Sequence, residues 1–303
     1  MTERASAARL VRATALDGLV RAFAVDTTTV VAELRERQGT DPVVTAALGR
    51  LATGALLLGA MLKEKEHTVT LRVRGDGPAG TLLATATGAG EVRGLAENPR
   101  PEIEQAVGGK LNVAGAVGRT GHLGVTRDLG LRHPYASTVE LVSGEIGDDL
   151  AYYLARSEQV PSAVGLGVFV RADGSVEAAG GYLVQLLPGL DEERVASLEA
   201  AIRRLPHPTE MLRAGETPEA ILGRVFPDGF EVLARMPVRV HCPCSRERAE
   251  RALVLLGSDE LTRLHAEDAG RGYSELTCEF CKMTYRFTGE ELAALIARAR
   301  GAA

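Results

Sequence analysis

Residues 242–281 read CPCSRERAERALVLLGSDELTRLHAEDAGRGYSELTCEFC, and all four cysteines of the 303-residue chain lie in this stretch. They form two close pairs, Cys242 with Cys244 and Cys278 with Cys281, joined by a long loop. Two short pairs of thiolates let one tetrahedral zinc ion hold together a segment that has little core of its own. The sequence therefore predicts one Zn2+ bound by these four cysteines.

The spacing within each pair also permits redox chemistry. Structural zinc ribbons usually carry two C-x-x-C pairs, whereas the first pair here is C-x-C. Thiolates on tetrahedral zinc lie roughly 3.8 Å apart, and a disulfide needs about 2.05 Å between its sulfurs. An oxidant would therefore close local disulfides and expel the metal, and the folding energy supplied by the metal would be lost with it. A zinc site that is purely structural stays the alternative.

The histidines do not suggest a catalytic site. His241 borders the cysteines and is a further candidate ligand, but four thiolates already satisfy zinc, so we expect it outside the coordination sphere. The others have no spacing typical of a metal site or a catalytic triad, and no nucleophile–base motif is visible. We therefore predict no catalytic residues and a protein that is not an enzyme.

Composition and charge favour a soluble globular chain. The chain is 45% hydrophobic and 25% charged, with a formal net charge of −5 that disfavours nucleic acid and anionic lipid as partners. The longest uncharged apolar run, residues 51–62, is shorter than the roughly 20 residues that span a membrane, and predicts a buried helix. No secretory signal is visible at the N-terminus, so we expect a cytoplasmic protein.

Helix and strand patterns are interspersed without strict alternation, which indicates an α+β fold. Residues 67–74 alternate like a half-buried strand, 75–80 form a turn, and 81–87 return as the second strand of a hairpin. Asp41 is a suitable N-cap for a helix over 42–62. The remaining expected elements of this region are strands over 137–142 and 165–170 and a helix over 149–156.

The sequence predicts three parts: a mixed core domain over 1–186, a helical linker over 187–236 and a zinc-binding domain over 237–303. The linker carries two short amphipathic helices, 191–205 and 217–225. Because each helix needs a neighbour to stay folded, the segment suits a detachable linker. Permanent packing against one domain is the alternative. In the last part we expect helices starting at 258 and 290 and a short strand over 285–287.

Motifs along nearly the whole chain resemble those of the redox-regulated bacterial heat-shock holdases, the 33 kDa chaperonin family. In family order they are GDGP at 75–78, VRG at 92–94, LGVTRD at 123–128, VELVSGE at 139–145, SEQ at 157–159, HCPC at 241–244 and CEFC at 278–281.

The resemblance implies an ATP-independent chaperone that is inactive while reduced and zinc-bound. It implies that oxidation joins Cys242 to Cys244 and Cys278 to Cys281, releases zinc and unfolds the zinc-binding domain and the linker. Unfolding client proteins would bind the surface so exposed, and the activated form would be a homodimer. The loop between the cysteine pairs is slightly longer than is typical of the family.

Two other hypotheses stay open. The first is an enzyme of unknown reaction with a structural four-cysteine zinc ribbon, which would keep its zinc under peroxide and turn over some small substrate. The second is a zinc-ribbon nucleic-acid module, against which the acidic balance of the chain counts.

Overall fold

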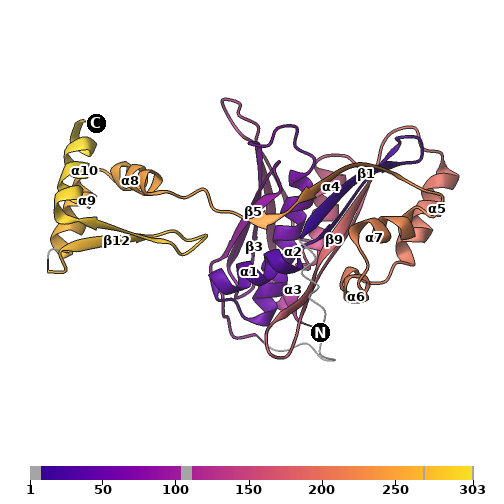
Figure 1. Ribbon diagram of the computed structural model, residues 1–303, viewed down its shortest axis with the longest axis horizontal. Helices are drawn as coiled ribbons and strands as arrows, with labels where there is room; N and C mark the ends of the chain where they lie inside the picture. Colours follow the sequence, from indigo (N-terminus) through magenta and orange to yellow (C-terminus); the bar gives the residue numbers. More distant parts are fainter. Residues whose placement is uncertain (1–7, 104–110, 269, 302–303) are drawn as a thin grey trace. The chain divides into compact units, whose positions relative to one another are not determined.

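The computed structural model describes residues 8–103, 111–268 and 270–301 (Figure 1). It divides into two compact units: the first ends at His241 and the second begins at Cys242. Helices and mostly antiparallel strands are mixed in both units, which confirms the α+β class. The three-part division by sequence stays a prediction.

Two sheets form the frame of the first unit. The strands of the five-stranded sheet, in spatial order, are β10 (Glu231–Pro237), β1 (Arg9–Ala15), β2 (Val20–Asp26), β9 (Val176–Leu186) and β8 (Ser162–Val170). Those of the six-stranded sheet are β11 (Arg239–Val240), β5 (Glu91–Ala96), β4 (Thr81–Thr87), β3 (Thr68–Gly75), β6 (Gly121–Asp128) and β7 (Tyr135–Glu140). Neighbouring strands are antiparallel, apart from the parallel pair β11 and β5.

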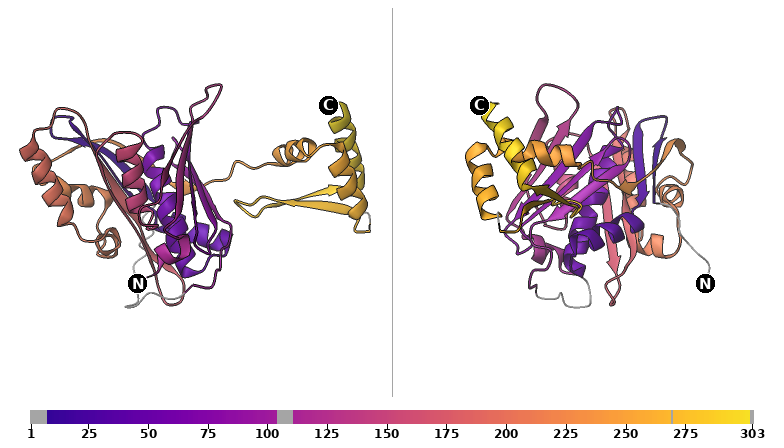
Figure 2. Two further views of the ribbon diagram at one scale, coloured as in Figure 1. Left: turned by 180° about the vertical axis from the view of Figure 1, so that it is seen from behind. Right: turned by 60° about the vertical axis from the view of Figure 1, so that its left-hand side comes forward.

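Helices fill the space between the sheets and cover the far face of one of them (Figures 1 and 2). The inner helices are α1 (Thr28–Gln38), α2 (Pro42–Gly59), α3 (Val113–Val117) and α4 (Gly147–Arg156). Those on the far face of the five-stranded sheet are α5 (Glu192–Arg203), α6 (Pro208–Arg213) and α7 (Pro218–Val225). The unit is therefore layered as sheet, helices, sheet, helices.

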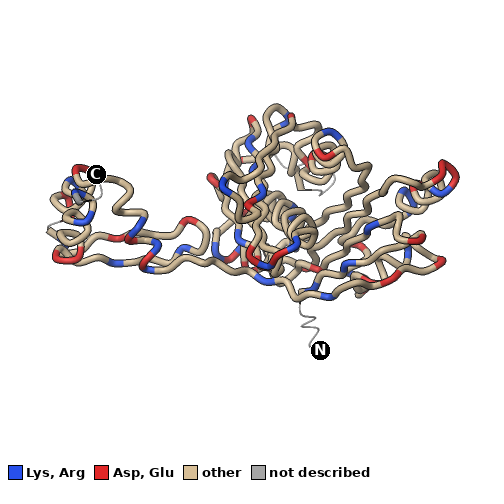
Figure 3. Tube along the Cα trace, turned by 90° about the horizontal axis from the view of Figure 1, so that it is seen from above, with Lys and Arg blue, Asp and Glu red and all other residues tan. Residues whose placement is uncertain are grey.

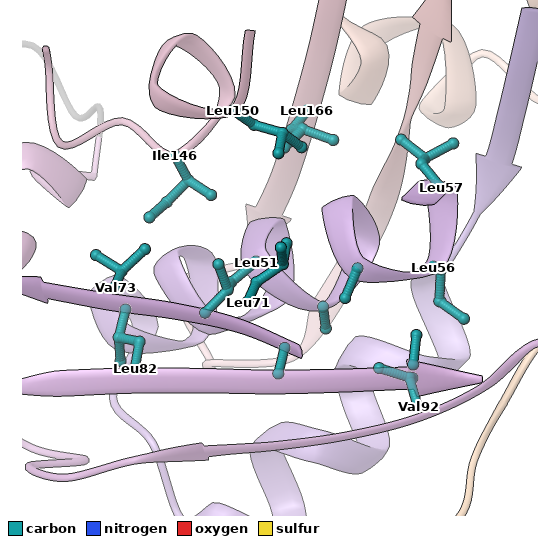
Figure 4. Close-up of a cluster of buried hydrophobic side chains, with 14 of the residues drawn as sticks. Leu51, Leu56, Leu57, Leu71, Val73, Leu82, Val92, Ile146, Leu150 and Leu166 are labelled. Atoms are coloured by element: carbon teal, nitrogen blue, oxygen red, sulfur yellow. The ribbon is translucent and has the colours of Figure 1, made fainter. Parts of the chain in front are cut away.

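Helix α2 is the centre of the main core. Asp41 caps it as predicted, its carboxylate accepting from the Val44 N–H at 2.7 Å. The helix is long and apolar enough to cross a membrane, yet 89% of that span is buried inside the unit, which confirms the predicted core helix. It ends before the predicted Leu62 because the N–H groups of Met61 and Leu62 bond carbonyls three residues back in tighter turns. Figure 4 shows Leu51 and Leu56 of α2 among side chains of both sheets and of α4, which include Leu71, Leu82, Leu166 and Leu150.

The five-stranded sheet is apolar on both faces. In β2, Phe23 and Val25 contribute to the core around α2, while Ala22 and Ala24 contribute to a second cluster under α5–α7. This second cluster explains why helices cover both sides. We predicted two helices in the linker region, and the structure has three, because Pro208 opens α6 at a position that proline tolerates. The same region also holds β10, which pairs with β1.

Two of the sequence motifs, GDGP at 75–78 and VELVSGE at 139–145, form turns that are held by a buried or capping aspartate. Asp76 of the GDGP turn accepts the N–H groups of Arg119 and Thr120. Asp149 is fully buried and accepts four backbone N–H groups: those of Val142, Ser143 and Gly144 in the VSGE segment and that of Ile146, which follows it. For the same reason β7 ends at Glu140 and not at the predicted Val142, whose N–H bonds Asp149 and not another strand.

The second unit has a small core. Its elements are α8 (Arg246–Leu255), α9 (Ser258–Glu267), β12 (Tyr273–Thr277), β13 (Thr284–Thr288) and α10 (Gly289–Gly301). Phe287 is buried among leucines of α8, α9 and α10. A unit of about 60 residues removes only about 60% of its unfolded surface from water, so this core needs an additional source of stability.

Candidate metal centre

The four cysteine sulfurs lie together in the second unit. Each Sγ lies within 4.8 Å of the other three, and all four residues are half-buried free thiols. The Sγ atoms of Cys242 and Cys278 are 3.7 Å apart, and those of Cys244 and Cys281 are 3.2 Å apart. The first separation is close to the roughly 3.8 Å expected between thiolates on tetrahedral zinc, and the second is shorter. The cysteines are thus positioned to bind one metal ion.

The second pair lies at the tip of the β12–β13 hairpin. The Cys278 N–H donates to the Met283 carbonyl at 2.9 Å, and the Lys282 N–H donates to the Cys278 carbonyl at 2.8 Å. Lys282 has φ of 59°, which turns the chain sharply after Cys281. The turn also aims the N–H groups of Phe280 and Cys281 at the Cys278 sulfur. Both sulfurs lie within 4.8 Å of each other at the hairpin tip.

The first pair is tied to this hairpin by a neighbouring arginine. Ser245 caps α8, its hydroxyl accepting from the Arg248 N–H at 3.3 Å, and so directs the chain out of the pair. Arg246 then donates to the Arg286 carbonyl at 2.8 Å and to Glu291 at 2.6 Å. Its guanidinium also lies 4.5 Å from the centre of the Phe287 ring. These contacts bring the two cysteine pairs together.

One side chain at the cluster was not predicted from the sequence. The Tyr285 hydroxyl lies 3.2 Å from Cys244 Sγ, and this hydrogen bond raises the pKa of Tyr285 to about 12. The sequence indicated only a short strand over 285–287. The contact depends on the hairpin bringing β13 beside the first pair, and no spacing rule would have given it.

The pKa values of three thiols depart from the ordinary value. Burial raises the pKa of Cys242, and it raises that of Cys281 to about 12. Burial also acts on Cys278, but the N–H groups of Cys281 and Phe280 outweigh it and lower the pKa of that thiol. A bound divalent cation would favour the thiolate form of all four. Metal binding must therefore displace protons, and the affinity increases with pH.

His241 is not one of the four residues of the cluster. Its N–H donates to the Val92 carbonyl at 2.9 Å, and its Nε2 lies 3.9 Å from a carboxylate oxygen of Glu91. Both contacts belong to the first unit.

A cleft of about 820 Å³ lies in the first unit, between the β1–β2 hairpin and α5. It is lined by Leu16 and Asp17 of the hairpin, Arg194 and Leu198 of α5, and Phe226 after α7. Within α5, which is described in full, Leu198 alone is buried. Helix α5 is therefore attached to the rest of the unit by few contacts.

The chain is similar to known proteins along nearly its whole length. Residues 8–288 match the family described as Hsp33 protein. The chain is 46% identical to the 33 kDa chaperonin of Bacillus subtilis, covering 94% of this chain and 97% of that one. It is 48% identical to the 33 kDa chaperonin of Geobacter sulfurreducens, covering 93% of each. The crystal structure of the 33 kDa chaperonin of Thermotoga maritima is similar, with 38% identity, a TM-score of 0.88 and coverage of 97% of this chain and 99% of that one.

Proposed function

This chain belongs to the Hsp33 protein family, and from that membership we propose that it is an ATP-independent holdase chaperone controlled by oxidation of its four cysteines. Family membership supports the chaperone function. The observation that carries the redox control is the cluster of four free thiols, whose sulfurs are all within 4.8 Å of one another.

In the reduced state, Cys242, Cys244, Cys278 and Cys281 hold one Zn2+. Four soft sulfur donors within 4.8 Å of one another favour zinc over harder cations that prefer oxygen ligands. The ion stabilises the folded second unit, because the core around Phe287 is small. While this unit is folded, the chaperone is inactive.

An oxidant such as a peroxide converts the cluster into two disulfides. Each disulfide takes two electrons from a pair of thiolates, and one peroxide molecule with two protons becomes two water molecules. We assign the bonds to Cys242 with Cys244 and Cys278 with Cys281. The sulfurs of a sequence-adjacent pair stay near each other when the unit loosens, whereas the cross pairs are 36 and 37 residues apart and separate. Zinc leaves because its ligands are consumed.

Loss of the zinc-bound fold then frees the linker region. Strand β10 leads through β11 directly to Cys242, so the chain entering the second unit is the end of the linker. Helix α5 is the weakly attached part of this region, with one buried side chain beside a cleft. Detachment of α5–α7 uncovers the apolar face of the five-stranded sheet, which includes Val11, Ala22 and Val184. We propose this face as the surface for unfolding client proteins.

The remaining properties follow from the same proposal. The activated form is a homodimer, and the protein acts in the cytoplasm without a catalytic residue. Nucleic acid and membranes are not its partners, a view supported by the mixture of basic and acidic residues along each unit in Figure 3.

The proposal predicts that oxidised protein suppresses aggregation and reduced protein does not. The assay follows light scattering of a thermally unfolding client with reduced zinc-loaded protein, with peroxide-treated protein, and with treated protein that has been re-reduced with zinc. We expect suppression in the second sample only. Failure of the oxidised, zinc-free protein to suppress aggregation contradicts the proposal. Retained zinc with turnover of a small substrate would favour the enzyme hypothesis instead.

A further inference from the structure

Tyr285 connects the two halves of the cysteine cluster. It lies in β13, in register with Leu276 of β12, on the hairpin that carries the second cysteine pair. Its hydroxyl nevertheless lies 3.2 Å from Cys244 Sγ, which belongs to the first pair. The contact therefore spans the site and joins two segments that are 41 residues apart in the chain.

The direction of this hydrogen bond follows from the chemistry of the sulfur. A thiolate has no proton to give, so the Tyr285 hydroxyl must be the donor when Cys244 is ionised. A donated hydrogen bond to an anion is about twice as strong as one between neutral groups, and it reduces the charge density on the sulfur. Partners of this kind fix the orientation of metal ligands and tune their reactivity.

We propose that Tyr285 is a positioning residue that sets how readily the first cysteine pair is oxidised. The inference rests on the proposed redox function. Its hydroxyl holds the Cys244 sulfur in the ligand position and lowers its nucleophilicity toward peroxide.

The hydrogen bond acts on the first step of oxidation. In that step the Cys244 thiolate attacks a peroxide oxygen, the O–O bond breaks, and the sulfur becomes a sulfenic acid as hydroxide leaves and takes up a proton from solvent to become water. The neighbouring Cys242 thiolate then attacks this sulfur and expels hydroxide, forming the disulfide. A disulfide sulfur is a weak acceptor, so the bond from Tyr285 is lost and the two halves of the site separate.

The test compares Tyr285→Phe with Tyr273→Phe in the full-length, reduced, zinc-loaded protein. Tyr273 is a matched control because it lies in β12 of the same hairpin, with its ring 4.9 Å from the Arg286 guanidinium carbon. We expect Tyr285→Phe to weaken zinc affinity about 10–100-fold by chelator competition and to speed peroxide-driven zinc release. Tyr273→Phe should match the wild type. Equal affinity and release rate in all three proteins would overturn the inference.

A second readout separates tuning of one sulfur from general loosening of the unit. Brief alkylation of the zinc-loaded protein, followed by mass spectrometry of each cysteine, compares Cys244 with Cys242 in the same molecule. We expect Tyr285→Phe to raise the labelling of Cys244 relative to Cys242. An equal rise at all four cysteines would contradict a specific role. Peroxide-driven zinc release in the wild type tests the proposed function separately. The role of Tyr285 is tested only by how much the release rate and the zinc affinity of the variant differ from those of the wild type.

Discussion

Replacing Cys242 or Cys278 by serine is expected to abolish stoichiometric zinc binding and to unfold the second unit while the first stays folded. Structural zinc contributes about 10–16 kcal/mol of apparent binding free energy in small zinc domains, and much of this is folding energy. Among the described residues of the second unit, the small core around Phe287 and Leu261 is the one hydrophobic cluster that could replace the stability supplied by zinc. The first unit has two larger clusters of its own, so it does not depend on the metal.

Zinc content and limited proteolysis of the reduced variants check this expectation. Ser274→Ala is a suitable control, because it removes a buried hydroxyl that has no hydrogen-bond partner from the same hairpin without touching a sulfur. The control should retain zinc and resist protease, while each cysteine variant should be cut within residues 242–301. A cysteine variant that keeps stoichiometric zinc with unchanged affinity would show that the ligand assignment is wrong.

Ile221→Ala is expected to make the chaperone active without oxidation. Ile221 and Leu222 of α7 are fully buried in the cluster that they form with Val11 and Ala22 of the five-stranded sheet. Removing the buried methyl and methylene groups costs about 2–5 kcal/mol. If the whole loss falls on the packing of α5–α7 against the sheet, the equilibrium between the docked and detached linker region shifts roughly 30-fold to several-thousand-fold toward the detached state. The apolar face of the sheet would then be open while zinc is still bound.

The measurement is client aggregation with reduced, zinc-loaded Ile221→Ala, alongside proteolysis of the linker region. Leu233→Ala is the control, because it makes the same kind of deletion in β10 at a side chain that is 48% exposed. We expect suppression by Ile221→Ala only. If α5–α7 become protease-sensitive while the reduced protein stays inactive, detachment of this region is not sufficient for client binding.

Local patterns predicted the elements that depend on neighbouring residues. The alternation over 67–74 gave β3, and Asp41 with Pro42 gave the start of α2. The four cysteines could be predicted as a metal site because two close pairs separated by a long loop are a spacing typical of zinc ligands, and this spacing is visible in the sequence itself.

The rest depends on pairing between distant residues. Strand β10 pairs with β1, more than two hundred residues earlier in the chain, and no local pattern encodes that partner. The sequence patterns therefore predicted only helices in the linker region, and strand β10 was missed. The Tyr285 contact with Cys244 was missed for the same reason, since it requires the hairpin register and the Arg246 tether together.

In the proposed mechanism, one metal-bound cysteine cluster controls the folding of the second unit and of the linker region. The decisive measurement counts zinc and free thiols on one reduced sample, before and after brief peroxide treatment with warming. Far-ultraviolet circular dichroism is followed on the same sample. We expect loss of one zinc and of all four thiols, together with partial loss of the helix signal. Retention of zinc and of the full circular dichroism signal after treatment would contradict it and make the site structural.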